Sequence, residues 1–163
     1  MSKIPIRYLP ATLSKRDKQK QKRMLMKSRK LYKKHQYYSR KPLPTFKTRK
    51  SSHIRDANKI YGIDKILPNK ALAMKTGCSV DALQKIVKKG AGAYFSSGSR
   101  PNQTAQSWGL ARLASSITGG KAAAVDYEII NKGCNHKKTA FILANKAIRK
   151  YGFGRSKTRK IKI

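Results

Sequence analysis

The stretch GAGAYFSSGSRPNQT, residues 90–104, is the part of the sequence best suited to chemistry with an anion. Glycines let backbone amides converge on one oxygen atom, and an arginine adds a bidentate contact. The stretch lacks the Gly-Lys-Ser/Thr of a Walker loop, and no predicted strand precedes it. The favoured alternative is a tightly packed turn that satisfies its own backbone groups. The candidate anion-binding loop comprises Gly90, Gly92, Ser96, Ser97, Gly98 and Arg100.

Tyrosines alternate with cations in the segment LYKKHQYYSRK, residues 31–41. Tyr32, Tyr37 and Tyr38 are interleaved there with Lys and Arg, a composition typical of surfaces that stack on bases and contact phosphates. Packing against a protein partner uses the same residue types, so both interpretations stay open. Trp108, the single tryptophan, has Leu110 close by on a predicted helix, which favours a core or interface anchor.

The sequence offers little for catalysis or metal binding. Its six acidic residues are scattered without an acid–base pair, and Cys78, Cys134 and His136 do not form a zinc motif. We therefore predict no enzymatic activity, no metal, no cofactor and no small-molecule substrate; an enzyme that uses the 90–104 stretch is the weakest alternative. Both cysteines are expected to stay thiols, because MSKIPIRYLP lacks the apolar core of a secretory signal.

Positive charge dominates the composition. The 163 residues hold 40 Lys and Arg against six Asp and Glu, a formal net charge of +34, which predicts an acidic partner and nucleic acid first. Residues 1–50 carry 18 of these cations and one acid. No apolar stretch approaches the roughly 20 residues of a membrane helix, so no membrane span is expected. The predicted contacts to a polyanion or partner are Lys15, Arg16, Lys22, Arg23, Arg29, Lys30, Lys33 and Lys34, with Arg155, Arg159 and Lys160 near the C-terminus.

The spacing of apolar residues, cap residues and glycines predicts an all-α protein. We expect a small domain of short helices at 51–152, an extended basic N-terminal arm at 1–50 and a short basic tail at 153–163. Ser14 and Asp17 form a helix-capping pattern for a helix at 15–38, and the prolines at 42 and 44 then favour an extended strap. Within the domain, helices are predicted at 52–61, 69–76, 79–89, 104–118, 121–132 and 136–151.

The segment KGAGAYFSSGSRPNQTAQSWGLARLASSITGGKAAAVDY resembles an uncharacterised domain family of large nucleocytoplasmic DNA viruses. Its most specific phrases are SSGSRPNQT, SWG-x-ARLAS and TGGKA, and the resemblance covers roughly residues 51–134. It supplies no catalytic residues. What it implies is a virion component, either a minor capsid protein or a DNA-associated one.

The leading hypothesis is thus a minor capsid protein of a large DNA virus, made in the host cytoplasm or nucleus and located in the virion. Its basic arms would bridge neighbouring capsid proteins, the major capsid protein among them, and possible partners include viral DNA. The alternatives are a packaging protein that binds nucleic acid without reading sequence and a ribosomal protein.

Overall fold

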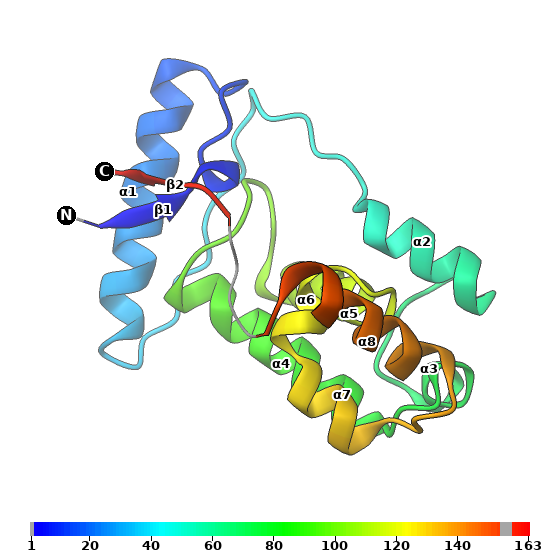
Figure 1. Cartoon of the computed structure of the whole chain (residues 1–163). Coiled ribbons are helices and arrows are strands. Elements are labelled where there is room, and N and C mark those ends of the chain that lie inside the picture. Colours follow the sequence, from blue (N-terminus) through cyan, green and yellow to red (C-terminus); the bar gives the residue numbers. More distant parts are fainter. Residues whose placement is uncertain (1, 154–157) are drawn as a thin grey trace. The chain divides into compact units, whose positions relative to one another are not determined.

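The computed structural model describes residues 2–153 and 158–163, and within them the chain is helical apart from one small sheet (Figure 1). The predicted all-α class is confirmed. No helix in the described part of the chain is long and apolar enough to cross a membrane. The helices are α1 (Lys15–Tyr32), α2 (Ser52–Tyr61), α3 (Lys70–Thr76), α4 (Val80–Ser96), α5 (Ala105–Ile117), α6 (Lys121–Val125), α7 (Tyr127–Gly133) and α8 (Thr139–Tyr151), and the strands are β1 (Lys3–Pro5) and β2 (Lys160–Lys162).

Helices with strong local caps begin and end where the sequence predicts. Gly62 closes α2 with φ 62° and Gly77 closes α3 with φ 76°, backbone angles that favour glycine. The Asn69 side chain accepts a hydrogen bond from Leu72 N at 3.0 Å and so caps α3. At α1, Ser14 Oγ accepts from Asp17 N at 3.1 Å, as the capping pattern predicts.

Four predicted boundaries are wrong, and three of them lie outside α4. The first helix stops at Tyr32 instead of residue 38, because the backbone turns at His35, which has φ 57°. The predicted helix at 121–132 is broken into α6 and α7 at Asp126, whose carboxylate is buried. The last helix begins at Thr139, after a turn closed by Lys138 N and Asn135 O.

The fourth helix is longer than predicted. It passes through Gly90 and Gly92 and ends at Ser96, so neither glycine lies in a loop. Gly90 is required by packing instead: a Cβ there would lie 2.8 Å from Gly109 Cα, where α4 and α5 approach each other.

The chain forms two compact units whose boundaries fall within α4 and α5. The first contains the residues up to Arg49, Ala91–Trp108 and the described residues from 158 onward; the second contains Lys50–Gly90 and the described residues 109–153. This grouping differs from the predicted arm, domain and tail. The N-terminal 49 residues pack with residues 91–108, and the C-terminal end pairs with them as β2, antiparallel to β1 with Ile161 opposite Ile4.

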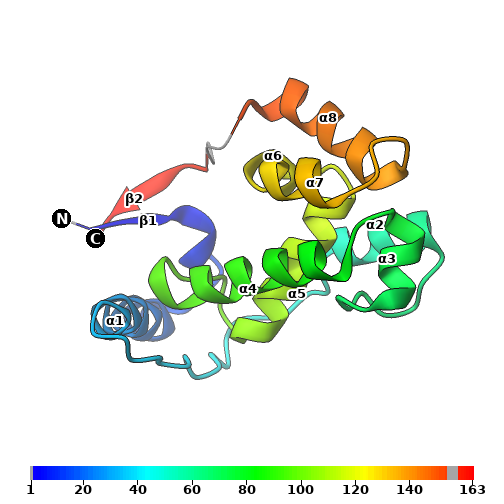
Figure 2. The same ribbon diagram turned by 90° about the horizontal axis from the view of Figure 1, so that it is seen from below.

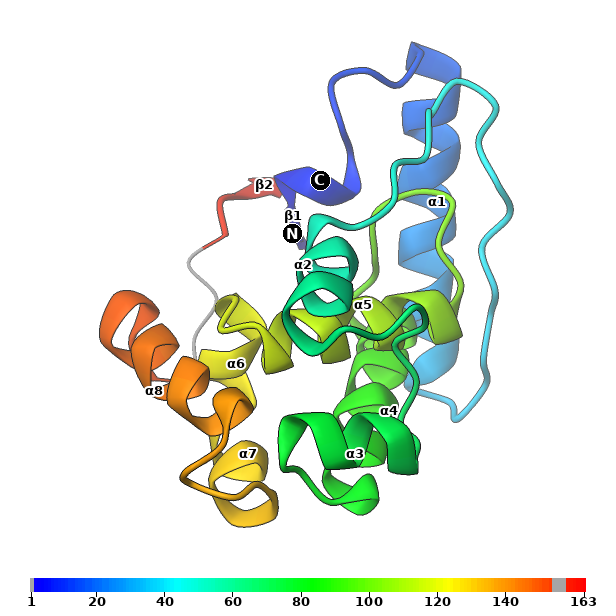
Figure 3. The ribbon, with the colours of Figure 1, turned by 90° about the vertical axis from the view of Figure 1, so that its right-hand side faces the viewer.

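The core of the first unit lies along one face of α1. Leu25 packs in a cluster with Ile4 and Tyr8, whereas its neighbour Met24 packs in another with Leu43. Residues 39–50, here called the strap, return antiparallel along α1 (Figure 3). In this way α1 is supported by the sheet and by the strap.

The second unit has a separate helical core, in which α8 packs beside α6 and α7 (Figure 2). Its fully buried side chains include Leu83, Ile86, Leu113 and Ile130. Cys78 and Cys134 form a disulfide that joins the segment before α4 to the end of α7. The expectation that both cysteines stay thiols is therefore wrong; their separation of 56 residues gave no sign that they meet.

Candidate polyanion-binding surface

The two faces of α1 differ in chemistry. Its buried residues are Asp17, Gln21, Met24, Leu25 and Ser28, spaced three or four apart or adjacent, so they form one stripe. The other positions are largely exposed, and the 18-residue helix carries nine Lys and Arg. One narrow stripe of small, polar and apolar residues is enough to pack α1 against the core of the first unit. The rest of the helix surface can therefore carry cations.

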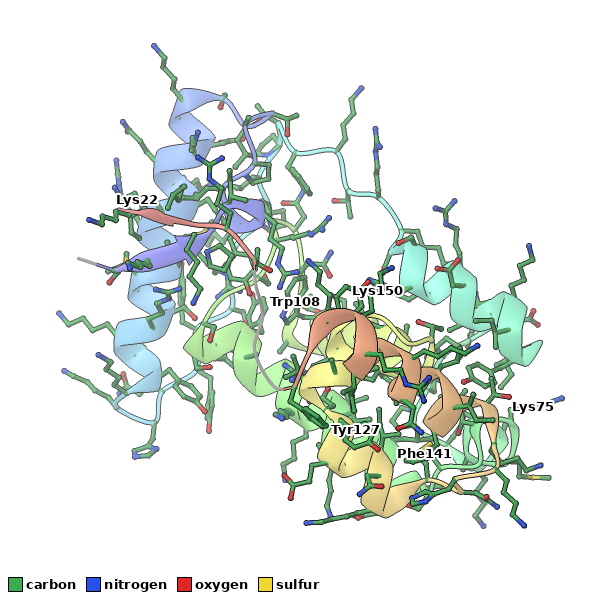
Figure 4. The ribbon with its side chains drawn as sticks, viewed as in Figure 1. Lys22, Lys75, Trp108, Tyr127, Phe141 and Lys150 are labelled. Carbon is green, nitrogen blue, oxygen red and sulfur yellow. A yellow bond between two sulfur atoms is a disulfide. The ribbon has the colours of Figure 1, made fainter. Side chains whose placement is uncertain are left out.

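Most of the predicted contact residues lie on this exposed surface. Lys22 extends outward from α1 in Figure 4. Arg155 lies outside the described residues. The exposed members of the predicted set are Lys15, Arg16, Lys22, Arg23, Lys30, Lys33 and Lys34 from α1 and the turn after it, and Arg159 and Lys160 at β2 in the same unit.

Arg29 has a different role from its neighbours. Its Nε and Nη2 donate to Ser97 O at 3.0 and 2.8 Å, and its Nη1 donates to Lys3 O at 3.2 Å. The side chain thus ties α1 both to the segment after α4 and to β1, which removes most of its donors from an external partner.

The first unit is almost free of acidic groups. Residues 1–49, 91–108 and 157–163 hold 22 Lys and Arg and one acid, Asp17. Asp17 accepts hydrogen bonds from Thr45 Oγ1 at 2.6 Å and Thr45 N at 3.1 Å, and these bonds lower the pKa of its carboxyl. The one carboxylate therefore fastens the strap to α1 and leaves the surface cations unneutralised.

Arg40 is the central residue that sequence reasoning missed. It is 9% exposed, and its guanidinium lies 3.8 Å from the centroid of the Tyr94 ring. It donates to Ser28 Oγ at 3.0 Å, Tyr94 O at 2.8 Å and Ser99 Oγ at 2.8 Å, so it joins the strap, α1 and the chain after α4. Burial lowers the pKa of Arg40, although the group stays charged at neutral pH. In sequence it resembles any exposed cation of the segment.

The predicted anion-binding loop is used differently. Gly90 and Gly92 lie inside α4, and Ser96 is its last residue. Gly98, with φ 118°, is packed so closely that a Cβ would lie 2.7 Å from Leu25 Cδ2. Ser97 O accepts from Arg29, and the backbone N–H of residue 98 donates to Ala93 O.

The end of this loop holds the strap. Asn102 Oδ1 accepts from Leu43 N at 2.6 Å, and its Nδ2 donates to Leu43 O, Phe46 O and Thr48 Oγ1. Arg100 remains exposed. Most polar groups of the loop thus form hydrogen bonds within the protein. This favours a packed turn over an anion-binding loop.

The predicted aromatic residues separate into two environments. Tyr37 is 70% exposed and makes edge contacts with Tyr32 at 6.1 Å and Phe95 at 5.1 Å between ring centroids. Tyr38 is half-buried beneath Lys27, whose Nζ lies 4.6 Å from its ring centroid. Trp108 is half-buried and packs edge-on against Tyr8 at 6.0 Å, as an anchor of the first unit.

The second unit holds a buried ion pair that the sequence did not reveal. Arg112 donates to both oxygens of Asp126 at 2.7 and 2.8 Å, and Lys89 Nζ lies 3.1 Å from the same carboxylate. Burial raises the pKa of Asp126, but Arg112 and Lys89 outweigh it, and the pKa is lowered. Fully paired, this carboxylate is suited to holding helices together. Among the described residues no group of three His, Cys, Asp or Glu could hold a metal ion.

Comparison with known proteins adds one finding. A family model described as a family of unknown function, DUF5824, matches residues 5–135. The comparison with curated proteins gave no match. The comparison with solved structures gave none either.

Proposed function

The chain belongs to the DUF5824 family of unknown function, and we propose that it binds nucleic acid through phosphate contacts without reading base sequence. The observation that carries this proposal is the outer face of α1, where cations are exposed along a helix in a unit whose one carboxylate is used internally. Phosphates supply the complementary charge at high density.

Rigid presentation distinguishes this surface from a flexible basic tail. Arg29, Arg40 and Asn102 fix α1, the strap and residues 97–102 to one another through hydrogen bonds. Cations held on a rigid element lose less conformational entropy on binding than those of a disordered arm. The same contacts argue against the hypothesis that residues 1–50 form an extended arm that bridges neighbouring proteins.

The expected affinity depends steeply on salt. If about six cations of α1 and the turn after it each neutralise a phosphate, the slope of log K against log salt for duplex DNA is about −5. Affinity then falls by about a thousandfold between 50 and 200 mM salt.

Fluorescence anisotropy with a labelled random-sequence duplex across salt concentrations tests the proposal. Replacing Arg16, Arg23 and Lys30 by Ala should weaken binding and make the salt slope shallower by about 3. The matched control removes the same charge from exposed positions of the second unit, by Ala at Lys65, Lys70 and Lys75. Equal effects of the two triple variants, or no binding at 50 mM salt, would contradict a site on α1.

A second candidate function is that of a minor capsid protein, which the resemblance of residues 51–134 to a domain family of large DNA viruses implies and which one observation favours. The second unit exposes large apolar side chains, with Met74 81%, Phe153 71% and Ile60 47% exposed, which a neighbouring protein would bury in an assembly. Cross-linking mass spectrometry on washed virions tests this candidate: cross-links from the second unit to the major capsid protein support it, and absence of the chain from virions refutes it.

A further inference from the structure

Six of the nine cations of α1 stand in two rows on either side of an uncharged crest. Residues seven apart lie almost in line on a helix, about 10.5 Å apart along its axis. One row is Arg16, Arg23 and Lys30. The other is Lys15 and Lys22, and Arg29, next in line, is bound to Ser97 O and Lys3 O within the unit. Between them, opposite the buried stripe, helical geometry places Gln19 and Met26, both exposed and also seven apart.

The dimensions of this helix match one groove of duplex DNA. An α-helix with its side chains is about 10–12 Å across, and the major groove of B-DNA is about 12 Å wide, whereas the minor groove is about 6 Å wide. The 18 residues of α1 span about 27 Å, so both rows can extend along the groove walls. Two rows suit the phosphates of two strands, while a single strand offers only one line of charge.

The crest is chemically suited to the groove floor. Gln19 can donate and accept hydrogen bonds at base edges, and Met26 offers an apolar contact to thymine methyl groups. Neither residue brings a charge that would be buried without a partner. Two such side chains give little discrimination among sequences, in keeping with binding that depends mainly on phosphates.

The elements next to α1 present cations as well. Lys3 on β1 and Lys162 on β2 are exposed at the sheet, and Lys41 and Lys47 are exposed on the strap. A groove-seated helix brings its flanking elements towards the phosphate backbones, and here both flanks are positively charged.

We propose that the partner of α1 is duplex DNA, with the helix seated in the major groove and Gln19 and Met26 facing the base edges. The inference rests on the proposed nucleic-acid binding. Its rival is single-stranded nucleic acid stacked on the exposed ring of Tyr37, which lies just beyond α1.

Three ligands of equal length separate these modes: a DNA duplex, an RNA duplex and a DNA single strand, each measured by anisotropy at the same salt concentration. A-form RNA has a deep, narrow major groove that a helix does not enter, so the DNA duplex should bind at least about tenfold more tightly than the RNA duplex. Equal binding of the two duplexes, or tightest binding of the single strand, overturns the inference.

Charge placed on the crest supplies the second readout. Met26→Glu should weaken binding of the DNA duplex about tenfold more than the matched change Met74→Glu on the second unit, because its carboxylate would be desolvated without a partner on the groove floor. Gln19→Glu should repeat the effect, and binding of the single strand should respond equally to the crest and control variants. Equal effects of Met26→Glu and Met74→Glu on the duplex reject groove docking.

The two proposals fail in different ways. Salt-dependent binding that is indifferent to the form of nucleic acid and to the crest variants leaves phosphate binding intact and refutes the groove. Absence of any binding at low salt refutes both.

Discussion

Replacing Arg40 by Met removes a buried guanidinium that joins the strap to α1 in the first unit. The side chain lies over the Tyr94 ring and donates three hydrogen bonds, to Ser28 Oγ, Tyr94 O and Ser99 Oγ. Methionine keeps an unbranched apolar stem but is shorter and has no donor and no charge. The change therefore tests whether a buried guanidinium without a carboxylate partner stabilises the fold.

The magnitude follows from what each partner loses. Ser28 and Ser99 keep a hydrogen bond, since each hydroxyl also donates to a backbone carbonyl, but the Tyr94 carbonyl loses this charged donor. A hydrogen bond from a charged group contributes about 1.5–3 kcal/mol, and a desolvated cation–π contact adds about 2 kcal/mol. Relief of the desolvation and of repulsion from Arg29 offsets part of this. We expect a net loss of about 3 kcal/mol in the free energy of unfolding.

Urea unfolding followed by tryptophan fluorescence measures this loss directly, because Trp108 is the single tryptophan and belongs to the first unit. Arg40→Lys keeps the charge without the planar fork and should fall between wild type and Arg40→Met. The neighbouring exposed change Lys41→Met is the control and should alter stability by less than about 0.5 kcal/mol. A loss below about 1 kcal/mol for Arg40→Met would refute the reasoning.

Three further predictions concern the second unit and α4. Gly90→Ala should lower the free energy of unfolding by about 1–3 kcal/mol, because the new Cβ overpacks against Gly109. Gly92→Ala in the same helix should raise it by up to about 1 kcal/mol, because nothing lies within 4 Å of the new Cβ. Similar shifts of the calorimetric melting temperature in the two variants would contradict this packing. Reducing the disulfide between Cys78 and Cys134 should lower the free energy of unfolding by about 4 kcal/mol, the chain-entropy value for a separation of 56 residues. Detection of two free thiols in the denatured, unreduced protein would disprove the disulfide. Asp126→Asn should cost about 3 kcal/mol at pH 7. Because the folded-state pKa lies below 3.8, the wild type's advantage is complete above that value and disappears as the pH falls through the folded-state pKa; urea titrations at several pH values should show the two proteins converging in acid.

The parts of the fold that the sequence predicted correctly are those decided by neighbouring residues. Asn69 and Gly77 bound α3 through contacts within four residues. At α2 only backbone groups act: Ser51 O accepts from Arg55 N, and the N–H of Gly62 donates to Asn58 O. Gly90 shows the limit of this reasoning. A glycine there predicted a helix end, but its role is the approach of Gly109 from a different helix, which no local pattern encodes.

Long-range organisation was not predictable from one sequence. Residues 91–108 join the N-terminal segment through Arg40 and Asn102, contacts between residues 54 to 59 positions apart. The basic surface was predictable because positive charge can be counted in a sequence. Which arginines are instead bound inside the fold was not predictable. Arg29 and Arg40 have the same residue type as Arg23, and only burial and hydrogen bonding separate structural from exposed cations.

The charge of the first unit links its stability to its partner. With 22 Lys and Arg, one acid and a buried guanidinium, the unit folds against its own repulsion. A polyanion that binds only the folded form adds about 2.7 kcal/mol of stability at a hundred times its dissociation constant. Added salt screens the repulsion in the free protein and at the same time weakens phosphate binding. The free first unit should therefore be least stable at low salt, where its complex with nucleic acid is tightest, and this opposition ties folding of the unit to occupation of α1.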